Sequence, residues 1–412
     1  MLDRRQCLAA VGGVATTALL QTGTSLSAAP PGARVLPDRT AFAPTDIAYL
    51  DNGSQHPMPL LSKAAVETYL AKRTLDPAAQ AFSLDEDGVR AKFARLINAE
   101  PDEIAYVQST TAGEQMVLRA LDLPASGGHI VTDTLHFFGS VPLYEEMARQ
   151  GCEVTWLKPV DGRIRIEDMR AAVRKGTKLV ALSLVSTING FEHDLKAVCD
   201  IAHAAGALVY ADIIHAAGCM PVDVKASGVD FAACASYKWL MGDFGLGFLY
   251  VRKDVMPRLK RTNYGYEGLA SAASHMYPLD PPGDRVMDYT FRPDATGAFA
   301  LGTHSFTVVA QLNQPLDYIA ALGIPAIQAH ARTITDRLKE ELPKRGYPLM
   351  TPREARAPIV TCVLADARKR LTEPMQAAKV RITMAGNRFR LTPSVQTSMT
   401  DVDRFLAALP KA

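Results

Sequence analysis

Short apolar runs alternate with amphipathic stretches between about residues 104 and 251, and this alternation constrains the fold more than any other feature of the sequence. The runs have the length of buried strands and lie at residues 104–108, 129–132, 153–157, 178–185, 207–211, 231–235 and 247–251. Between two of them, residues 195–205 have helical spacing and end at Gly206, a residue that favours helix termination. Strands that alternate with helices predict an α/β fold with a mainly parallel, helix-covered sheet.

The pattern changes near residue 302. With 412 residues, of which 48% are hydrophobic, the chain is long enough to fill more than one core. Long helical stretches at 306–322 and 324–345 precede short strand-like runs at 359–364 and 388–391. We therefore expect a large domain at residues 61–301 and a smaller C-terminal α+β domain at residues 302–412, which an N-terminal arm at residues 30–60 joins.

The N-terminus has the pattern of an export signal. Arg4 and Arg5 precede a stretch of small and apolar residues, and residues 25–29 (SLSAA) have the spacing that a signal peptidase recognises. The apolar run is short for a membrane span, with an uncleaved anchor as the alternative. We expect residues 1–29 to be a twin-arginine signal peptide, so that the twin-arginine machinery exports the protein to the periplasm or beyond.

The charge and the cysteines exclude several classes of function. A formal net charge of +2, from 45 basic and 43 acidic side chains, provides no field that would hold nucleic acid or an acidic membrane. The six cysteines form no C-x-x-C pair, which argues against a zinc site, and no metal is expected. No G-x-G-x-x-G motif follows an early strand, as a dinucleotide fold would require. A small-molecule partner is therefore expected.

Three polar residues follow predicted strands: Thr187, Asp212 and Lys238. Because the carboxyl ends of parallel strands open into one crevice, we expect the three side chains to lie together. A lysine in an apolar setting has a depressed pKa, and its neutral amine can form an imine with an aldehyde, while the carboxylate suits a pyridinium nitrogen. Singly, a strand-end lysine is more often exposed and a strand-end aspartate more often caps a helix, so the spacing of the set carries the hypothesis.

Residues 211–218 (ADIIHAAG) and 229–240 (VDFAACASYKWL) resemble the cofactor core of the class V aminotransferase family, which includes cysteine desulfurases, isopenicillin N epimerase and kynureninase. The resemblance extends from about Tyr49 to Phe405. It implies a fold-type I enzyme that depends on pyridoxal 5'-phosphate, with a mainly parallel seven-stranded sheet in the large domain. The Ser-Tyr-Lys sequence and a histidine three residues after the aspartate look most like kynureninase.

The resemblance also implies a role for each residue of the cofactor site. Lys238 would hold the cofactor as a Schiff base, Asp212 would pair with the pyridine nitrogen, and His136 would stack on the ring. His215 and Thr187 would form hydrogen bonds near the phenolic oxygen. The residues that would hold the phosphate are Thr110, Thr111, Ser236 and Tyr237, together with Thr303 from the partner subunit of a homodimer. A helix that begins at Thr110 would favour an anion at its N-terminus.

On the substrate side, Arg390 matches the residue that binds the α-carboxylate in this family. A guanidinium presents two parallel donors to a carboxylate, and Arg388 is the competing candidate. The N-terminal turn with Asn52, Ser54 and Gln55 resembles the segment that lines the substrate.

The sequence indicates the cofactor more clearly than it indicates the reaction. Lys238 is the expected proton shuttle. The last cysteine, Cys362, lies in an apolar strand-like run and no Arg-x-Gly-x-His-Cys pattern exists, which predicts that the enzyme is not a cysteine-persulfide desulfurase. We expect a lyase or an isopenicillin N epimerase-like enzyme that acts on an amino acid, with a kynureninase-like C–C hydrolase or a true aminotransferase as the alternative. A non-catalytic exported binding protein would lack Lys238, Asp212 or the phosphate turn, and none of these is missing.

Overall fold

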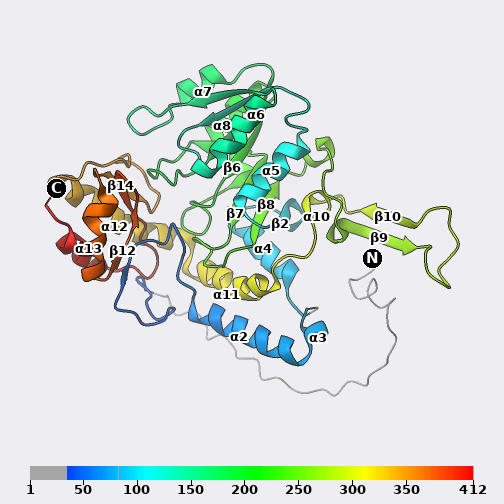
Figure 1. Cartoon of the computed structure of the whole chain (residues 1–412), viewed down its shortest axis with the longest axis horizontal. Helices are drawn as coiled ribbons and strands as arrows, with labels where there is room; N and C mark the ends of the chain where they lie inside the picture. The colour runs from blue at the N-terminus through cyan, green and yellow to red at the C-terminus, as the bar shows by residue number, and fades with distance from the viewer. Residues whose placement is uncertain (1–34, 82, 412) are drawn as a thin grey trace.

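The computed structural model describes residues 35–81 and 83–411 (Figure 1). The export signal expected at residues 1–29 lies outside the described residues. Among the described residues, no helix combines the length and the apolar composition that a membrane span needs.

A seven-stranded sheet forms the centre of the larger part of the molecule. Its strands lie in the order β2-β8-β7-β6-β5-β3-β4. They are β2 (Ile104–Val107), β3 (His129–Asp133), β4 (Glu153–Leu157), β5 (Thr177–Ser183), β6 (Leu208–Asp212), β7 (Phe231–Ala235) and β8 (Gly247–Val251). Strand β8 runs antiparallel to both its neighbours, and the other pairs are parallel. The predicted mainly parallel, seven-stranded sheet is confirmed.

Helices cover both faces of this sheet, which explains why its strands read as continuous apolar runs. Successive residues of a strand point to opposite faces: Val209 and Ala211 belong to one core, and Leu208 and Tyr210 to the other. The first core includes α4 (Glu86–Leu96), α7 (Ile166–Ala172), α8 (Leu195–Ala204) and α11 (Phe306–Leu322). The second includes α5 (Thr110–Ala120), α6 (Val141–Arg149) and α10 (Ala295–Phe299).

A second, three-stranded antiparallel sheet has the order β11-β14-β13. It consists of β11 (Val360–Val363), β14 (Arg388–Leu391) and β13 (Thr383–Met384), and its core includes α12 (Ile324–Lys344), α13 (Ala367–Ala377) and α14 (Met399–Ala408). The N-terminal segment joins this core, because β1 (Ala48–Tyr49) pairs in parallel with β12 (Val380–Arg381). No finding tests the domain boundaries, which stay a prediction.

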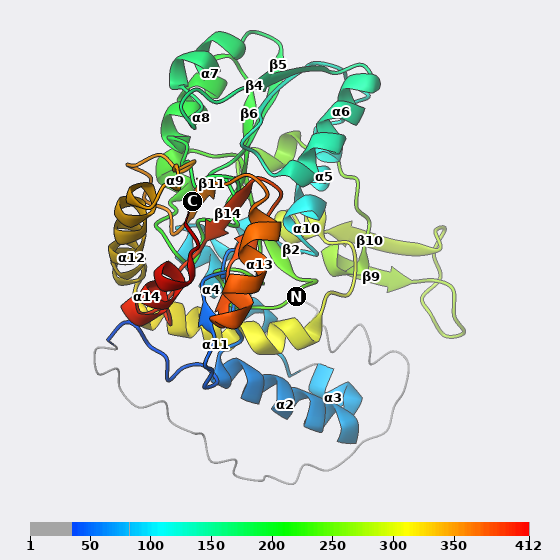
Figure 2. The same cartoon turned by 60° about the vertical axis from the view of Figure 1, so that its left-hand side comes forward.

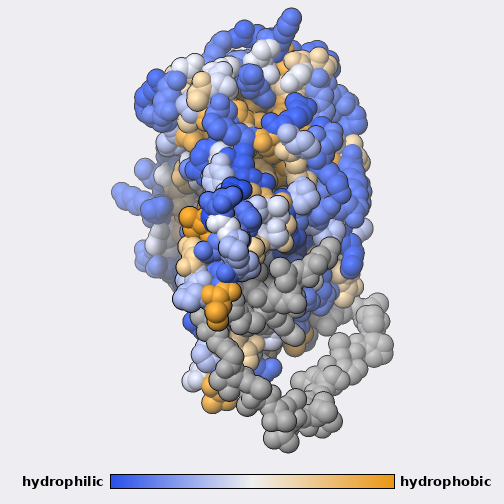
Figure 3. Space-filling view, turned by 90° about the vertical axis from the view of Figure 1, so that its right-hand side faces the viewer, coloured by the Kyte–Doolittle hydropathy of each residue, from blue (hydrophilic) through white to orange (hydrophobic). Residues whose placement is uncertain are grey.

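Several elements lie outside the seven-stranded and the three-stranded sheets. Helix α2 (Leu60–Leu75) lies along α11, and α3 (Pro77–Ala81) follows it (Figure 2). A hairpin of β9 (Leu269–Ser274) and β10 (Met287–Phe291) projects from the body, and α9 (Val224–Ser227) is a single turn before β7. Seen from the side of the hairpin, the surface is mostly hydrophilic, with hydrophobic side chains in smaller groups (Figure 3).

Gly218 allows the turn after β6 to approach the loop after β7. It has a φ of +96°, and a Cβ atom there would lie 2.7 Å from the carbonyl oxygen of Trp239. We expect Gly218→Ala to combine a left-handed backbone cost of about 1–2 kcal/mol with an overpacking cost of about 1–3 kcal/mol. Gly151, with a φ of +101° and no atom near its absent Cβ, is the matched control. Urea unfolding should show a clearly larger loss for Gly218→Ala than for Gly151→Ala, and equal losses would contradict this packing.

Candidate active site

A cavity of about 320 Å³ opens between the carboxyl ends of the large sheet's strands and the small sheet. Its described lining contains Gly53, Ser54, Phe137, Phe138, Thr187, Ile188, Tyr237, Lys238, Thr383, Ala385, Arg388 and Arg390. Of the predicted site residues, Ser54, Thr187, Tyr237, Lys238 and Arg390 therefore meet at one cavity. They come from four separate parts of the chain, which the pairing of strands brings together.

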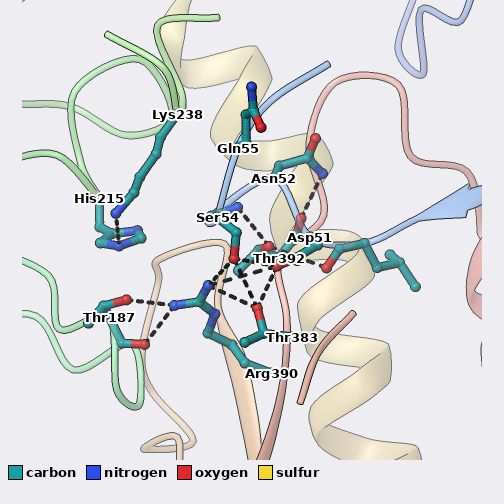
Figure 4. A network of polar contacts seen from close by, with 12 residues as sticks. Asp51, Asn52, Ser54, Gln55, Thr187, His215, Lys238, Thr383, Arg390 and Thr392 are labelled. Atoms are coloured by element: carbon teal, nitrogen blue, oxygen red, sulfur yellow. Dashed lines mark hydrogen bonds and ion pairs between the residues drawn. The ribbon is translucent and has the colours of Figure 1, made fainter. Parts of the chain in front are cut away.

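Lys238 follows β7 and is buried, and its Nζ lies 2.9 Å from Nε2 of His215 (Figure 4). Burial lowers the pKa of Lys238 to about 8, against the opposing effect of Asp212. Burial and the charge of Lys238 also hold the pKa of His215 well below its ordinary value, so this imidazole is neutral and accepts from the amine. The site thus contains a buried amine that is close to deprotonation at neutral pH.

Asp212 ends β6, the strand beside β7, and is buried. Its Oδ1 accepts from the backbone N–H of Ile214 at 2.9 Å. Burial raises the pKa of Asp212 to about 6, although this hydrogen bond and the charge of Lys238 act in the opposite direction. A cationic nitrogen beside the carboxylate would offset that cost of burial. Amine and carboxylate come from neighbouring strand ends and form no ion pair with each other, as a ring between them requires.

His136 follows β3 and lies deep behind the cavity. Its Nδ1 is 2.8 Å from Oγ of Ser183, which faces Asp212 in the pairing of β5 with β6. Its Nε2 is 2.9 Å from Oε1 of Glu114, so both ring nitrogens have side-chain partners.

The expected phosphate turn lies at the start of α5. Helix α5 begins at Thr110, and Ser109 caps it by accepting from the N–H of Ala112 at 3.1 Å. The first N–H groups of a helix have no acceptor within the helix, so this N-terminus suits an anion. Near the end of β7, Ser236 donates to the carbonyl of Asp243 at 2.7 Å, and Tyr237 stacks on Phe244.

Arg390 lies on β14, and oxygen acceptors from other segments surround its guanidinium group. One terminal nitrogen donates to the carbonyl and the hydroxyl of Thr187, at 3.0 and 2.6 Å. The other donates to the hydroxyls of Ser54 and Thr383, both at 3.0 Å, and lies 3.8 Å from Asp51 (Figure 4). Its Nε is buried and has no hydrogen-bond partner among the described residues. Arg388, two residues away on the same strand, lines the cavity but is exposed, which makes Arg390 the better anchored candidate for a carboxylate.

Thr383 was missed by the sequence analysis. It faces Arg390 across the pairing of β13 with β14, and only this register makes it a neighbour. Other predicted site residues are not among the described lining of this cavity, namely Asn52, Gln55, Thr110, Thr111, His136, Asp212, His215, Ser236 and Thr303. Asn52 donates to the carbonyl of Thr392, Gln55 is exposed and turned away, and the Thr303 hydroxyl lies 2.7 Å from that of Tyr266. Their predicted roles, like those of the other site residues, stay predictions.

Pyridoxal 5'-phosphate fits this donor set. A buried amine with a lowered pKa suits its aldehyde, the buried carboxylate of Asp212 suits its ring nitrogen, and the start of α5 suits its phosphate.

Comparisons with known proteins agree with this fit. The model of the family described as Aminotransferase class-V matches residues 49–386. A curated relative named probable cysteine desulfurase, from Methanothermobacter thermautotrophicus, is 30% identical over 303 residues, which cover 71% of this chain and 72% of the relative.

Solved structures share the fold. The apo cysteine desulfurase of Thermococcus onnurineus NA1 has a TM-score of 0.75 and 23% identity, over 88% of this chain and 93% of that one. The cystine C–S lyase C-DES, in complex with its product cysteine persulfide, has a TM-score of 0.77 and 17% identity, over 88% and 96%. Another structure of C-DES, a mutant, has glycine covalently linked to the PLP cofactor, with a TM-score of 0.78 and 18% identity, over 90% and 98%.

These findings correct the prediction that the enzyme is not a cysteine-persulfide desulfurase. Relatives and structural neighbours that are named cysteine desulfurases contradict it. The prediction rested on the cysteines, and the five in the described part of the chain are indeed buried. The prediction used the absence of one cysteine motif and not the cofactor core that the chain shares with these relatives, so it could not decide the reaction.

The lowered pKa of Lys238 predicts how its reactivity depends on pH. Because the neutral amine is the reactive form, its fraction rises as the pH increases through about 8. Reductive methylation of the cofactor-free protein, followed by peptide mass spectrometry, should label Lys238 with a midpoint near pH 8. A midpoint near 10.5, the ordinary value, would show that the amine is not buried as described.

Proposed function

The chain belongs to the class V aminotransferase family of pyridoxal 5'-phosphate enzymes, and we propose that it cleaves the Cβ–S bond of a sulfur-containing α-amino acid such as cystine or cysteine. The observation that carries this proposal is the cavity itself, in which the buried amine of Lys238 and the guanidinium of Arg390 line one space. The names of the relatives, cysteine desulfurase and cystine C–S lyase, support the sulfur-containing substrate.

Each residue has a defined part in this reaction. The bound cofactor supplies an aldehyde for the substrate's amino group and a ring that withdraws electrons from Cα. Arg390 binds the α-carboxylate with two parallel donors, and this orients Cα toward Lys238. Asp212 balances positive charge at the ring nitrogen. Phe137 and Phe138 line the cavity and give it apolar side chains, although Phe138 is 66% exposed before substrate binds.

The bond changes balance without any further reagent except water. Nζ of Lys238, as the neutral amine, takes the Cα proton. The Cβ–S bond then breaks, and sulfur leaves with the bonding electron pair as hydrosulfide from cysteine, or as cysteine persulfide when the substrate is cystine. Hydrolysis of the remaining three-carbon unit gives pyruvate and ammonia.

One observation favours a lyase over an epimerase. Among the lining residues that the structure describes, Lys238 is the sole amine, carboxylate or imidazole group, and burial raises the pKa of the Tyr237 phenol, which makes it a weaker proton donor. Loss of a β-substituent needs one base at Cα, whereas a two-base epimerase also needs a proton donor on the opposite face of Cα. The desulfurase reaction, in which sulfur passes to an acceptor and alanine is left, is the second candidate, which the relatives' names favour.

Product analysis distinguishes these reactions. The holoenzyme is incubated with a panel of amino acids that includes L-cystine and L-cysteine, and pyruvate, ammonia, alanine, the keto acid with the substrate's own side chain, the D-isomer and anthranilate are measured separately. We expect pyruvate and ammonia in equal amounts, and none from Lys238→Ala. Alanine as the main product would support the second candidate, whereas D-amino acid or keto acid alone would overturn the proposed C–S cleavage.

Arg390 should control substrate binding more than protein stability. We expect Arg390→Gln to raise KM about 30-fold to 150-fold, because a hydrogen bond between charged groups contributes about 2–3 kcal/mol. Arg165→Gln, which removes an exposed guanidinium paired with Asp168, is the control and should leave KM unchanged. We would measure KM by steady-state kinetics, with the substrate that the product analysis identifies. The melting temperature of each variant shows whether its stability has changed. An unchanged KM would exclude Arg390 as the carboxylate site.

We also propose that the protein is a homodimer in which Thr303 serves the partner's site. Large exposed hydrophobic side chains support an interface here: Phe244, Tyr264, Tyr266, Leu279, Val286 and Leu301. Export by the twin-arginine pathway, which the residues before 30 suggest, is a further proposal.

A mixing experiment tests the shared site. Lys238→Ala and Thr303→Ala proteins, each with low activity, should regain activity when they are mixed under conditions that exchange subunits. Hybrid dimers then contain one site with both residues intact. If Thr303 acts within its own chain, or if the protein is monomeric in sedimentation, mixing will not raise activity above the mean of the two variants.

A further inference from the structure

A buried carboxylate lies behind His136, and three donors converge on it. Glu114, in the second turn of α5, is 3% exposed. It accepts from Nε2 of His136 at 2.9 Å, from Oγ of Ser140 at 2.6 Å and from the hydroxyl of Tyr144 at 2.6 Å. No part of the reaction described above uses this carboxylate.

The geometry favours an ion pair. Burial alone would raise the pKa of Glu114, but the charge and hydrogen bond of His136, with the two hydroxyls, lower it overall. Burial likewise disfavours a charged His136, yet Glu114 raises its pKa above the ordinary value. An ionised Glu114 requires a hydrogen on Nε2 of His136, and Nδ1 can either donate to Ser183 or accept from its hydroxyl, so the charged ring fits this geometry and is favoured by the buried carboxylate beside it.

This pair adjoins the cofactor site. Nδ1 of His136 contacts Ser183, and Ser183 lies opposite Asp212 in the parallel pairing of β5 and β6. The charges of both His136 and Glu114 act on Asp212, the first lowering and the second raising its pKa. Helix α5, which begins at Thr110, carries Glu114 in its second turn, so one helix extends from the expected phosphate site to this pair.

We propose that Glu114 is a positioning residue that keeps His136 protonated and fixes its ring plane, so that a cationic imidazole faces the cofactor ring. A cation next to an aromatic ring stabilises electron density on that ring. The cation would therefore favour loss of the Cα proton, whatever bond breaks afterwards. This inference requires the cofactor but does not require the proposed C–S cleavage. An experiment can therefore contradict either the inference or the cleavage without contradicting the other.

Two matched variants separate charge from packing. Glu114→Gln keeps the shape of the side chain and removes its charge. Tyr144→Phe removes a donor to the same carboxylate and keeps the charge. The protein is labelled with [¹⁵N]histidine, with and without cofactor, and the His136 signals are assigned by difference with His136→Phe.

In wild type and in Tyr144→Phe we expect both His136 nitrogens to be protonated at pH 7.5, where a free imidazole is neutral. In Glu114→Gln we expect the neutral ring, a shift of the visible cofactor band, and a kcat lower by about fivefold to 30-fold, the size of a cation–π contribution. A neutral His136 in wild type overturns the proposal, and this measurement decides even if Glu114→Gln does not fold. A Glu114→Gln protein with a lower melting temperature but unchanged histidine and cofactor spectra overturns it as well.

Discussion

The burial of one amine is the constraint on which the rest of the site depends. Lys238 lies at the end of a central strand and is only 8% exposed, and this burial brings its pKa to about 8. Its direct partner is the neutral imidazole of His215, and no carboxylate of the described residues forms an ion pair with it. The large sheet thereby provides a nucleophilic amine, and the neighbouring strand end provides the carboxylate of Asp212 that the cofactor ring needs.

The small sheet provides the other side of the cavity, which carries Arg390. Arg390 reaches across from β14 and is held by hydroxyl and carbonyl oxygens from three separate segments. The hydrogen-bond acceptors of Arg390 are neutral, and the Asp51 carboxylate lies farther away, at 3.8 Å, so the guanidinium keeps charge for an incoming carboxylate. The two sheets thus bring an amine and a guanidinium to opposite sides of one cavity, which is the arrangement that an α-amino acid fits.

The sequence predicted the framework well and the contacts around it less well. Strands buried on both faces are continuous apolar runs, so the ends of all seven were predicted within two residues, and Lys238 and Asp212 followed from them. Thr383 and Glu114 reach the site through strand register and helix rotation, which no local pattern reveals. Asn52 and Gln55 failed to enter the cavity because the direction of a turn depends on its partners, here the carbonyl of Thr392. The inference from cysteine spacing failed because it used the absence of one cysteine motif to judge a chemistry that belongs to the shared core.

A crystal structure of the cofactor-loaded protein tests the central claim most directly. The account predicts continuous electron density from Nζ of Lys238 to the cofactor, with the ring nitrogen within hydrogen-bond distance, about 2.8 Å, of the Asp212 carboxylate. It would be contradicted by a cofactor joined to a different lysine, or by a ring whose nitrogen points away from Asp212.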